Sequence, residues 1–243
     1  MEIINFNSSK EFLQCPYYTE GYESSLFKYK SKYVIKMFKS NVLKYLTNKQ
    51  DKIILLHATD YPFISKPLAT VTIENKFKGY LMNFINGEVL SDYSDHITKD
   101  ELIDIFICLL EKINTLHQGK IYLGDIKPDN FIVSNGNIHI IDCDNFSIDS
   151  LENNYLSKYQ TLLPKYKKVS PVNLDIMFLL MMYAELKQNG HYNRYNPKPI
   201  PHYLDTAIIS NDLKNKLLFW AMNPNLILTD DIKQTLEKEK KII

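Results

Sequence analysis

Two short apolar runs on either side of a tight turn are the feature that most constrains the fold of this chain. Phe131–Val133 and Ile138–Ile141 are rich in residues that favour strands, and Asn135-Gly136 lies between them. An Asn-Gly pair between two such runs is a strong signal for a two-residue hairpin turn. The pattern therefore predicts an antiparallel hairpin within residues 122–146.

Four polar residues flank this predicted hairpin. Asp125, Lys127 and Asn130 precede its first strand, and Asp142 follows its second strand. Antiparallel pairing brings Asn130 and Asp142 to the same end of the ribbon. An amide oxygen and a carboxylate are hard ligands that suit Mg²⁺, whose coordination phosphate and water usually complete. The segment predicts a site for a metal-bound nucleotide; the alternative is an ordinary hairpin between Asp/Asn-rich turns.

Residues 1–85 predict a β-rich lobe with one helix. Leu26–Tyr29 and Tyr33–Phe38 predict a second hairpin, and the apolar positions within Asn41–His57 favour a helix. Two further strands are expected, at Phe63–Val71 and Phe77–Ile85.

Residues 86–243 predict a larger and mostly helical lobe, which begins at the turn signal Asn86-Gly87. Thr98–Gln118 has apolar residues at helical spacing, with a capping-box pattern at its start. The run Ile176–Ala184 is apolar on all sides, which is typical of a helix inside a core, so a buried helix is expected near Asp175–Lys187. We therefore expect an α+β fold with two lobes, residues 1–85 and residues 86–243.

Composition narrows the partners and the location. The chain has 29 basic and 28 acidic residues, a formal net charge of +1, so nothing calls for nucleic acid or an anionic membrane as a partner. The strongly apolar run Ile176–Ala184 is far shorter than the ~20 residues that span a bilayer. Three widely spaced cysteines and no signal-peptide pattern favour a reducing, cytoplasmic location.

The loop before the hairpin resembles the catalytic loop of the protein kinase superfamily. The family pattern is H-R-D-L-K-P-x-N, and the chain has L-G-D-I-K-P-D-N at residues 123–130. The family's D-F-G metal motif corresponds to D-C-D at residues 142–144. The resemblance implies that Asp125 is the catalytic base and that Asn130 and Asp142 bind the metal. It further implies that Lys127 contacts the transferred phosphate, as in Ser/Thr-specific members.

The same resemblance implies a nucleotide site in the first lobe. Lys36, in Tyr-Val-Ile-Lys, is similar to the family's V-A-I-K lysine on the third strand, which pairs with the α- and β-phosphates. Gly21 is the one glycine left of the family's phosphate-covering loop. Asp51 is aligned with the helix glutamate that pairs with this lysine; the alternative is an exposed helix aspartate. The resemblance also implies that adenine lies between Leu26 and Val34 on one side and Ile132 on the other, beside a hinge segment that contains Met82 and Phe84; the alternative is that these residues are ordinary core.

Several residues depart from the family pattern. Leu123 and Gly124 replace His-Arg, and the arginine is the family's receptor for a phosphorylated activation segment, so activity is expected not to depend on that phosphorylation. Asp144 replaces the glycine of D-F-G, and it either joins the metal site or caps the next turn. Asp175 is similar to the aspartate that supports the catalytic loop; the alternative is an ordinary first-turn aspartate.

The expected activity is that of an ATP- and Mg²⁺-dependent Ser/Thr protein kinase that transfers the γ-phosphate to a protein hydroxyl. The motifs also resemble those of the atypical bacterial and phage group of kinases, G-D-x-x-P-x-N and D-x-D. Two alternatives stay open. One is a small-molecule kinase of the aminoglycoside or choline phosphotransferase type, which shares the Gly-Asp pair and the D-x-D motif. The other is a nucleotide-binding pseudokinase that serves as a scaffold.

Overall fold

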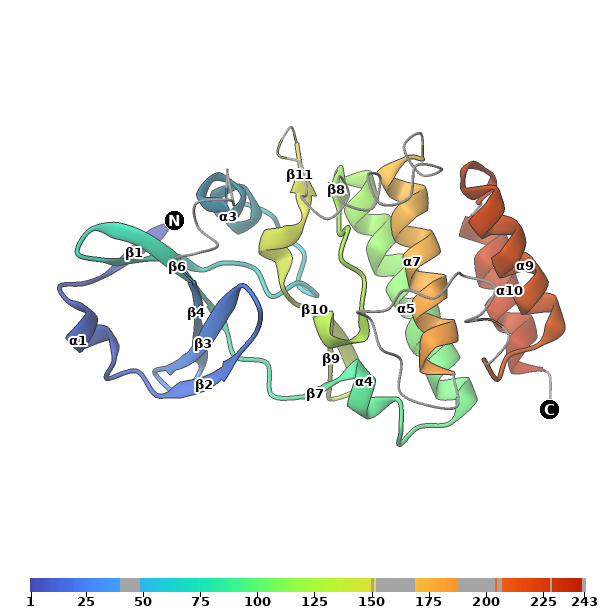
Figure 1. Cartoon of the computed structure of the whole chain (residues 1–243), viewed down its shortest axis with the longest axis horizontal. Coiled ribbons are helices and arrows are strands. Elements are labelled where there is room, and N and C mark those ends of the chain that lie inside the picture. Colours follow the sequence, from blue (N-terminus) through green and yellow to red (C-terminus); the bar gives the residue numbers. More distant parts are fainter. Residues whose placement is uncertain are drawn as a thin grey trace. The chain divides into compact units, whose positions relative to one another are not determined.

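A computed structural model of the chain describes residues 1–39, 49–149, 151, 169–187, 204, 207–227 and 229–241. It has a mixed α+β architecture, and the chain divides into two compact units (Figure 1). Unit 1 is residues 1–87 with 139–144, and unit 2 is residues 88–138 with 145–243. The expected lobe boundary after residue 85 lies close to this division. The segment 139–144 differs from expectation, because it packs with unit 1.

Unit 1 is built on a six-stranded sheet with the strand order β1-β5-β6-β4-β3-β2. Strand β1 pairs with β5 in parallel, and the other neighbours pair antiparallel. The strands are β1 (Glu2–Phe6), β2 (Tyr17–Glu20), β3 (Ser24–Tyr29), β4 (Tyr33–Phe38), β5 (Ala69–Ile73) and β6 (Lys76–Asn83), with the short helix α1 (Ser9–Phe12) between β1 and β2.

The hairpin expected at residues 26–38 is confirmed as β3 and β4, with Tyr29 opposite Tyr33. The strand expected at Phe63–Val71 is wrong in its first half, because β5 begins only at Ala69. Pro67 lies in that first half and has no N–H to donate to a sheet. Before β5, Ile64 forms only an isolated bridge with Ile140.

Helix α3 (Lys49–His57) packs against β5 and β6. The first half of the helix expected at Asn41–His57 lies outside the described residues. Successive side chains of a strand point to opposite faces of a sheet. Ile35 of β4 accordingly joins a core cluster with Phe12 and Val71, and its neighbour Val34 joins a second cluster with Ile53 of α3. Both faces of the sheet are therefore covered at β4.

The hairpin predicted from Asn135-Gly136 lies mostly in unit 2. Strands β9 (Phe131–Ser134) and β10 (Asn137–Ile140) are neighbours in a three-stranded sheet with β7 (Glu88–Val89). The last two residues of β10 belong to unit 1. Asn135 and Gly136 have φ angles of 49° and 73°. Positive φ at both central residues defines the type I′ turn, which Asn-Gly favours. The prediction of this hairpin is confirmed.

Helices make up most of the rest of unit 2. Helix α5 (Lys99–Gln118) has the expected capping box between Thr98 and Glu101, and it packs against α7 (Pro171–Leu186) and α10 (Thr229–Lys240) (Figure 1). Helix α7 begins four residues before the predicted Asp175, because Ser170 caps it. The remaining elements are α4 (Leu90–Tyr93), β8 (Ile121–Tyr122), η1 (Pro128–Asn130), η2 (Cys143–Asn145), β11 (Ser147–Ile148), α9 (Asn211–Met222) and η4 (Pro224–Leu226). Within the described residues, no helix has the length and apolarity needed to cross a membrane.

Candidate functional site

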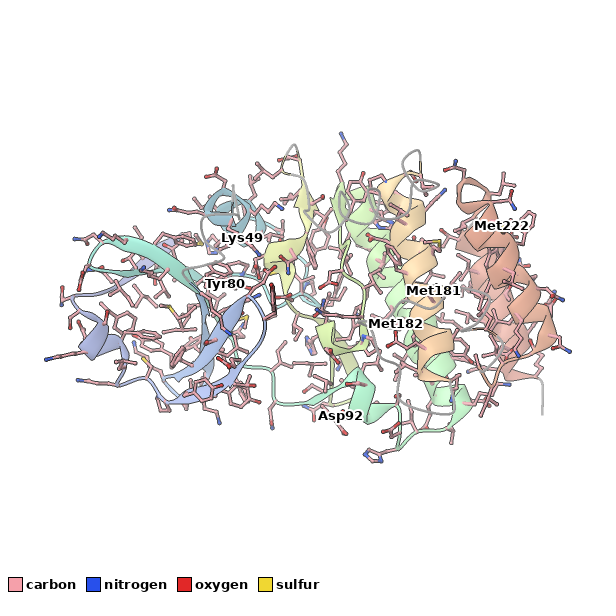
Figure 2. All side chains as sticks on the ribbon, in the orientation of Figure 1. Lys49, Tyr80, Asp92, Met181, Met182 and Met222 are labelled. Carbon is pink, nitrogen blue, oxygen red and sulfur yellow. The ribbon has the colours of Figure 1, made fainter. Side chains whose placement is uncertain are left out.

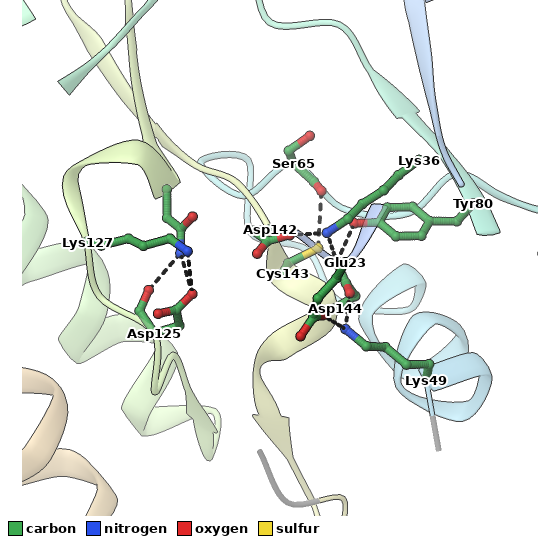
Figure 3. Close-up of polar contacts among 11 residues, drawn as sticks. Glu23, Lys36, Lys49, Ser65, Tyr80, Asp125, Lys127, Asp142, Cys143 and Asp144 are labelled. Carbon is green, nitrogen blue, oxygen red and sulfur yellow. Dashed lines mark hydrogen bonds and ion pairs between the residues drawn. The ribbon is translucent and has the colours of Figure 1, made fainter. Parts of the chain in front are cut away.

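Five polar side chains of unit 1 meet in a group that we call the Asp144 cluster (Figure 3). Its members come from four places in the chain: Lys36 from β4, Lys49 from α3, Tyr80 from β6, and Asp142 and Asp144 from the segment after β10. Figure 2 shows Lys49 and Tyr80 in the same part of unit 1. The fold therefore collects residues 64 to 108 positions apart in sequence.

Asp144 is fully buried at the centre of this cluster. Its Oδ1 accepts a hydrogen bond of 2.8 Å from the hydroxyl of Tyr80 and lies 2.5 Å from Nζ of Lys36. Its Oδ2 pairs with Nζ of Lys49. Because each oxygen of Asp144 pairs with an ammonium group, Asp144 anchors a buried ion-pair network. Its expected place among the metal ligands stays a prediction.

The charges of the cluster hold one another in the ionised state. Burial alone would raise the pKa of Asp144, but the ammonium groups of Lys36 and Lys49 hold that pKa below its ordinary value. Burial would likewise lower the pKa of Lys36, and the carboxylates of Asp142 and Asp144 raise it instead. Burial raises the pKa of Tyr80, and the charge of Asp144 adds to the effect, so Tyr80 stays a neutral donor.

Lys36 also pairs with Asp142, which brings together the strand lysine and the first aspartate of the D-C-D motif. The side chain of Asp142 is 23 % exposed, whereas that of Asp144 is fully buried. Asp142 has a φ of 64°, which non-glycine residues rarely adopt. Such backbone conformations cluster at functional sites, where the surrounding structure imposes them.

The expected partnership between Asp51 and Lys36 is not what the structure has. Asp51 is exposed on α3, as the alternative reading held, and the carboxylates that pair with Lys36 are Asp142 and Asp144. The helix instead contributes a cation, Lys49. The alignment with the family's helix glutamate failed because one helix turn presents Asp51 and Lys49 in different directions.

Gly21 lies in the turn between β2 and β3, where the resemblance expects a phosphate-covering loop. A Cβ atom added there would meet only the carbonyl oxygen of Ser24, at 4.0 Å. Gly21 is also absent from the residues with positive φ. The structure therefore gives no steric reason for a glycine at this position. Lys39 ties the turn to β4, because its Nζ donates to the carbonyl oxygen of Gly21 at 2.9 Å.

Four of the five residues expected around adenine share one apolar cluster of unit 1. Val34 and Met82 are buried in this cluster, and Leu26 and Phe84 pack against it half-buried. The fifth, Ile132, lies on β9 in unit 2, opposite Val89 of β7. Within unit 1, the four residues form an apolar surface made from three adjacent strands and the segment that follows β6.

Asp125, Lys127 and Asn130 form a second polar group in unit 2. The Nδ2 group of Asn130 donates to the backbone oxygen of Asp125 at 2.7 Å and to its Oδ2 at 3.2 Å. Lys127 Nζ lies 2.9 Å from the same Oδ2. Because the amide nitrogen of Asn130 already donates hydrogen bonds to Asp125, its side-chain oxygen is the atom that suits a metal ion.

Asp175 fixes the backbone that carries this group. Its fully buried carboxylate accepts hydrogen bonds from the backbone N–H of Leu123 at 2.7 Å and of Gly124 at 2.8 Å. It also lies 3.0 Å from Nε2 of His117 on α5. The expected supporting role of Asp175 is thus confirmed in geometry. Gly124 has a φ of 71°, which explains a glycine immediately before Asp125.

Each unit offers an oxygen donor whose chemical type suits a hard cation. In unit 1, Asp142 offers a partly exposed carboxylate, and in unit 2, Asn130 offers an amide oxygen; Mg²⁺ takes both kinds of ligand alongside phosphate. Among the described residues, no three His, Cys, Asp or Glu side chains gather as a metal site on their own. Lys36 supplies a buried ammonium group suited to phosphate.

Three features were missed by sequence reasoning: Lys49, Tyr80 and Gly79. Lys49 and Tyr80 carry no local pattern that distinguishes them from a solvent-facing lysine and a core tyrosine. Gly79 did carry a signal, since a glycine inside a strand often marks a close backbone approach. A Cβ atom at Gly79 would lie 1.9 Å from the carbonyl oxygen of Lys36.

Comparison of the chain with known proteins adds no family to this description. No protein-family model matches the sequence, and no curated protein matches it.

Proposed function

We propose that this protein is a kinase-like phosphotransferase that uses ATP and Mg²⁺ to phosphorylate a protein hydroxyl. The observation that carries the proposal is the pairing of Lys36 with Asp142, which are 106 residues apart in sequence. The resemblance assigns both residues to the phosphate end of the nucleotide. Their convergence in unit 1 is what a phosphate and metal site of this type requires.

The apolar cluster supports the nucleotide part of the proposal. Leu26, Val34, Met82 and Phe84 would contact the adenine ring, and Lys36 would contact the phosphates. The sheet order adds support, because Lys36 lies on the third strand of the antiparallel series β2-β3-β4. A flat apolar ring bound on apolar side chains, with a cation for the phosphates, is a common arrangement in nucleotide sites.

The loop of unit 2 supports the transfer step. Asp125 would accept the proton of the acceptor hydroxyl, and Lys127 would stabilise charge on the transferred phosphoryl group. The salt bridge between them at 2.9 Å would position the carboxylate of Asp125 before the acceptor arrives. The resemblance implies that Asn130 and Asp142 would hold Mg²⁺, which would supply neutralising charge at the phosphates.

The test is a transfer assay with labelled ATP and Mg²⁺, with and without generic protein acceptors. The variants are Asp125→Ala and Asp142→Ala, and the matched control is Asp129→Ala, an exposed carboxylate in the same loop. Label on protein that the first two variants abolish and the control retains supports the proposal. Transfer only to a small alcohol or sugar favours the small-molecule alternative. Nucleotide binding without turnover favours the pseudokinase alternative, and absence of nucleotide binding refutes all three.

A further inference from the structure

We infer that Lys49 is a positioning residue of the nucleotide site, which shares the charge of Asp144 with Lys36 and so keeps the ammonium group of Lys36 able to contact a phosphate. The inference rests on the proposed function and deepens it. It replaces the expected helix glutamate with a pairing of opposite polarity, in which the helix supplies a cation and the D-C-D motif supplies the carboxylate.

The first argument is the burial of Lys49. Its side chain is 5 % exposed, and its Nζ pairs with Oδ2 of Asp144 and lies 3.5 Å from Oε2 of Glu23. The same Nζ lies 5.1 Å from the ring centroid of Phe38. A buried ammonium group is costly unless it is paired in this way. An exposed lysine would meet no such constraint, so the fold commits Lys49 to these partners.

The second argument is how the oxygens of Asp144 are divided. Oδ1 faces Lys36 and Tyr80, and Oδ2 faces Lys49. Donors from β4, β6 and α3 therefore fix the carboxylate from three directions (Figure 3). If Lys49 were removed, the whole negative charge of Asp144 would act on Lys36. Lys36 would then be held more tightly by protein and would be less able to contact a phosphate.

The third argument is the second partner of Lys49. Glu23 lies in the turn between β2 and β3, the segment where the kinase resemblance expects the phosphate-covering loop. Lys49 is therefore a link between that turn, helix α3 and the D-C-D motif. All three elements belong to unit 1. A single side chain that contacts both the turn and Asp144 is well placed to set the geometry around Lys36.

The experiment measures nucleotide affinity with a fluorescent ATP analogue and Mg²⁺ in the wild type and in a double-mutant cycle. The variants are Lys49→Met, Asp144→Asn and their combination, with Lys49→Arg as the charge-conserving variant. Gln50→Met is the matched control, because Gln50 is exposed on the same helix. Asp51→Asn tests the rival helix residue. Circular dichroism and chemical unfolding establish that each variant is folded before affinity is compared.

We expect Lys49→Met to weaken nucleotide binding about tenfold, the size of effect that loss of an orienting contact produces. Lys49→Arg should restore most of the affinity, and the double variant should be no weaker than the worse single variant, because residues of one network are not additive. A folded Lys49→Met protein with wild-type affinity overturns the inference. Additive effects of Lys49→Met and Asp144→Asn on nucleotide affinity also overturn it, as does a loss of affinity that Asp51→Asn causes and Lys49→Met does not. If Lys49→Met does not fold, Lys49→Arg and Asp144→Asn decide, and wild-type affinity in Asp144→Asn overturns the inference. A folded wild type that binds no nucleotide overturns the proposed function and this inference together.

Discussion

Gly79 lets strand β6 approach the backbone of Lys36 so closely that no side chain fits between them. A Cβ atom at Gly79 would lie 1.9 Å from the carbonyl oxygen of Lys36 and 2.9 Å from its carbonyl carbon. Both atoms belong to the backbone and cannot rotate away. The close pairing of β4, which carries the buried Lys36, with β6 therefore requires a glycine at position 79.

Gly79→Ala should destabilise the protein by about 3 kcal/mol, at the upper end of the range for overpacking, because strands β4 and β6 must separate at Lys36. Chemical unfolding followed by circular dichroism measures this change. Gly21→Ala is the matched control, since its nearest neighbour would be 4.0 Å away, and it should be close to neutral. Equal stabilities of the two variants would contradict the prediction.

Asp175→Asn should lower both stability and turnover. The amide that replaces the carboxylate has one acceptor oxygen, whereas Asp175 serves two backbone N–H groups and His117. The loss should be about 2–4 kcal/mol, since buried donors lose a charged acceptor. Asp104→Asn is the comparison variant: it removes a charge from an exposed pair with Lys240 and should cost less than about 1 kcal/mol. Unfolding curves for both variants check the ranking.

Gly124→Ala should cost about 1–2 kcal/mol, because an L-residue at a φ of 71° is strained. Gly136→Ala has a φ of 73° and nothing within 4 Å of the added atom, so it should show the same cost from backbone strain alone. Only Gly124→Ala should also reduce turnover, since Gly124 precedes Asp125. A Gly124→Ala protein with full stability would show that the backbone is not held in this conformation.

Activity should not depend on phosphorylation of the chain. Gly124 stands where the family has the arginine that receives a phosphorylated activation segment. Four Ser and Thr residues that follow the D-C-D motif are candidates for phosphorylation. Ser147 is buried in β11, and Ser150, Ser157 and Thr161 lie outside the described residues. Phosphatase treatment, verified by mass spectrometry, should leave the transfer rate unchanged. A large loss of rate would contradict this expectation.

The start of helix α5 should give a measurable dependence of stability on acid pH. Hydrogen bonds from the backbone N–H and hydroxyl of Thr98 lower the pKa of Glu101 below the ordinary 4.5. A lowered folded-state pKa stabilises the protein above the unfolded value, and this contribution is lost as pH falls from about 4.5 through the folded value. The free energy of unfolding of the wild type should therefore fall more steeply with acid than that of Glu101→Gln. Parallel pH profiles for the two proteins would contradict this assignment.

Local sequence alone determined the hairpin β9–β10 and the start of α5. Asn135-Gly136 adopts positive φ at low cost, and Thr98 and Glu101 cap each other within one turn. Asp125, Lys127 and Asn130 were found because their order and spacing beside the hairpin form a recognisable pattern within six consecutive residues. Such patterns can be read directly, since every partner lies within a few positions.

Only the tertiary structure decided the partners of Asp144. Lys49 and Tyr80 lie 95 and 64 residues from Asp144 in sequence, and the residues around them form no pattern that predicts a contact with it. Asp51 matched the expected motif, yet it is exposed, whereas Lys49 two positions earlier is buried. Burial determines which of these two helix residues joins the cluster, because a charge that the fold removes from water needs an opposite charge beside it. The sequence alone does not show which face of the helix becomes buried.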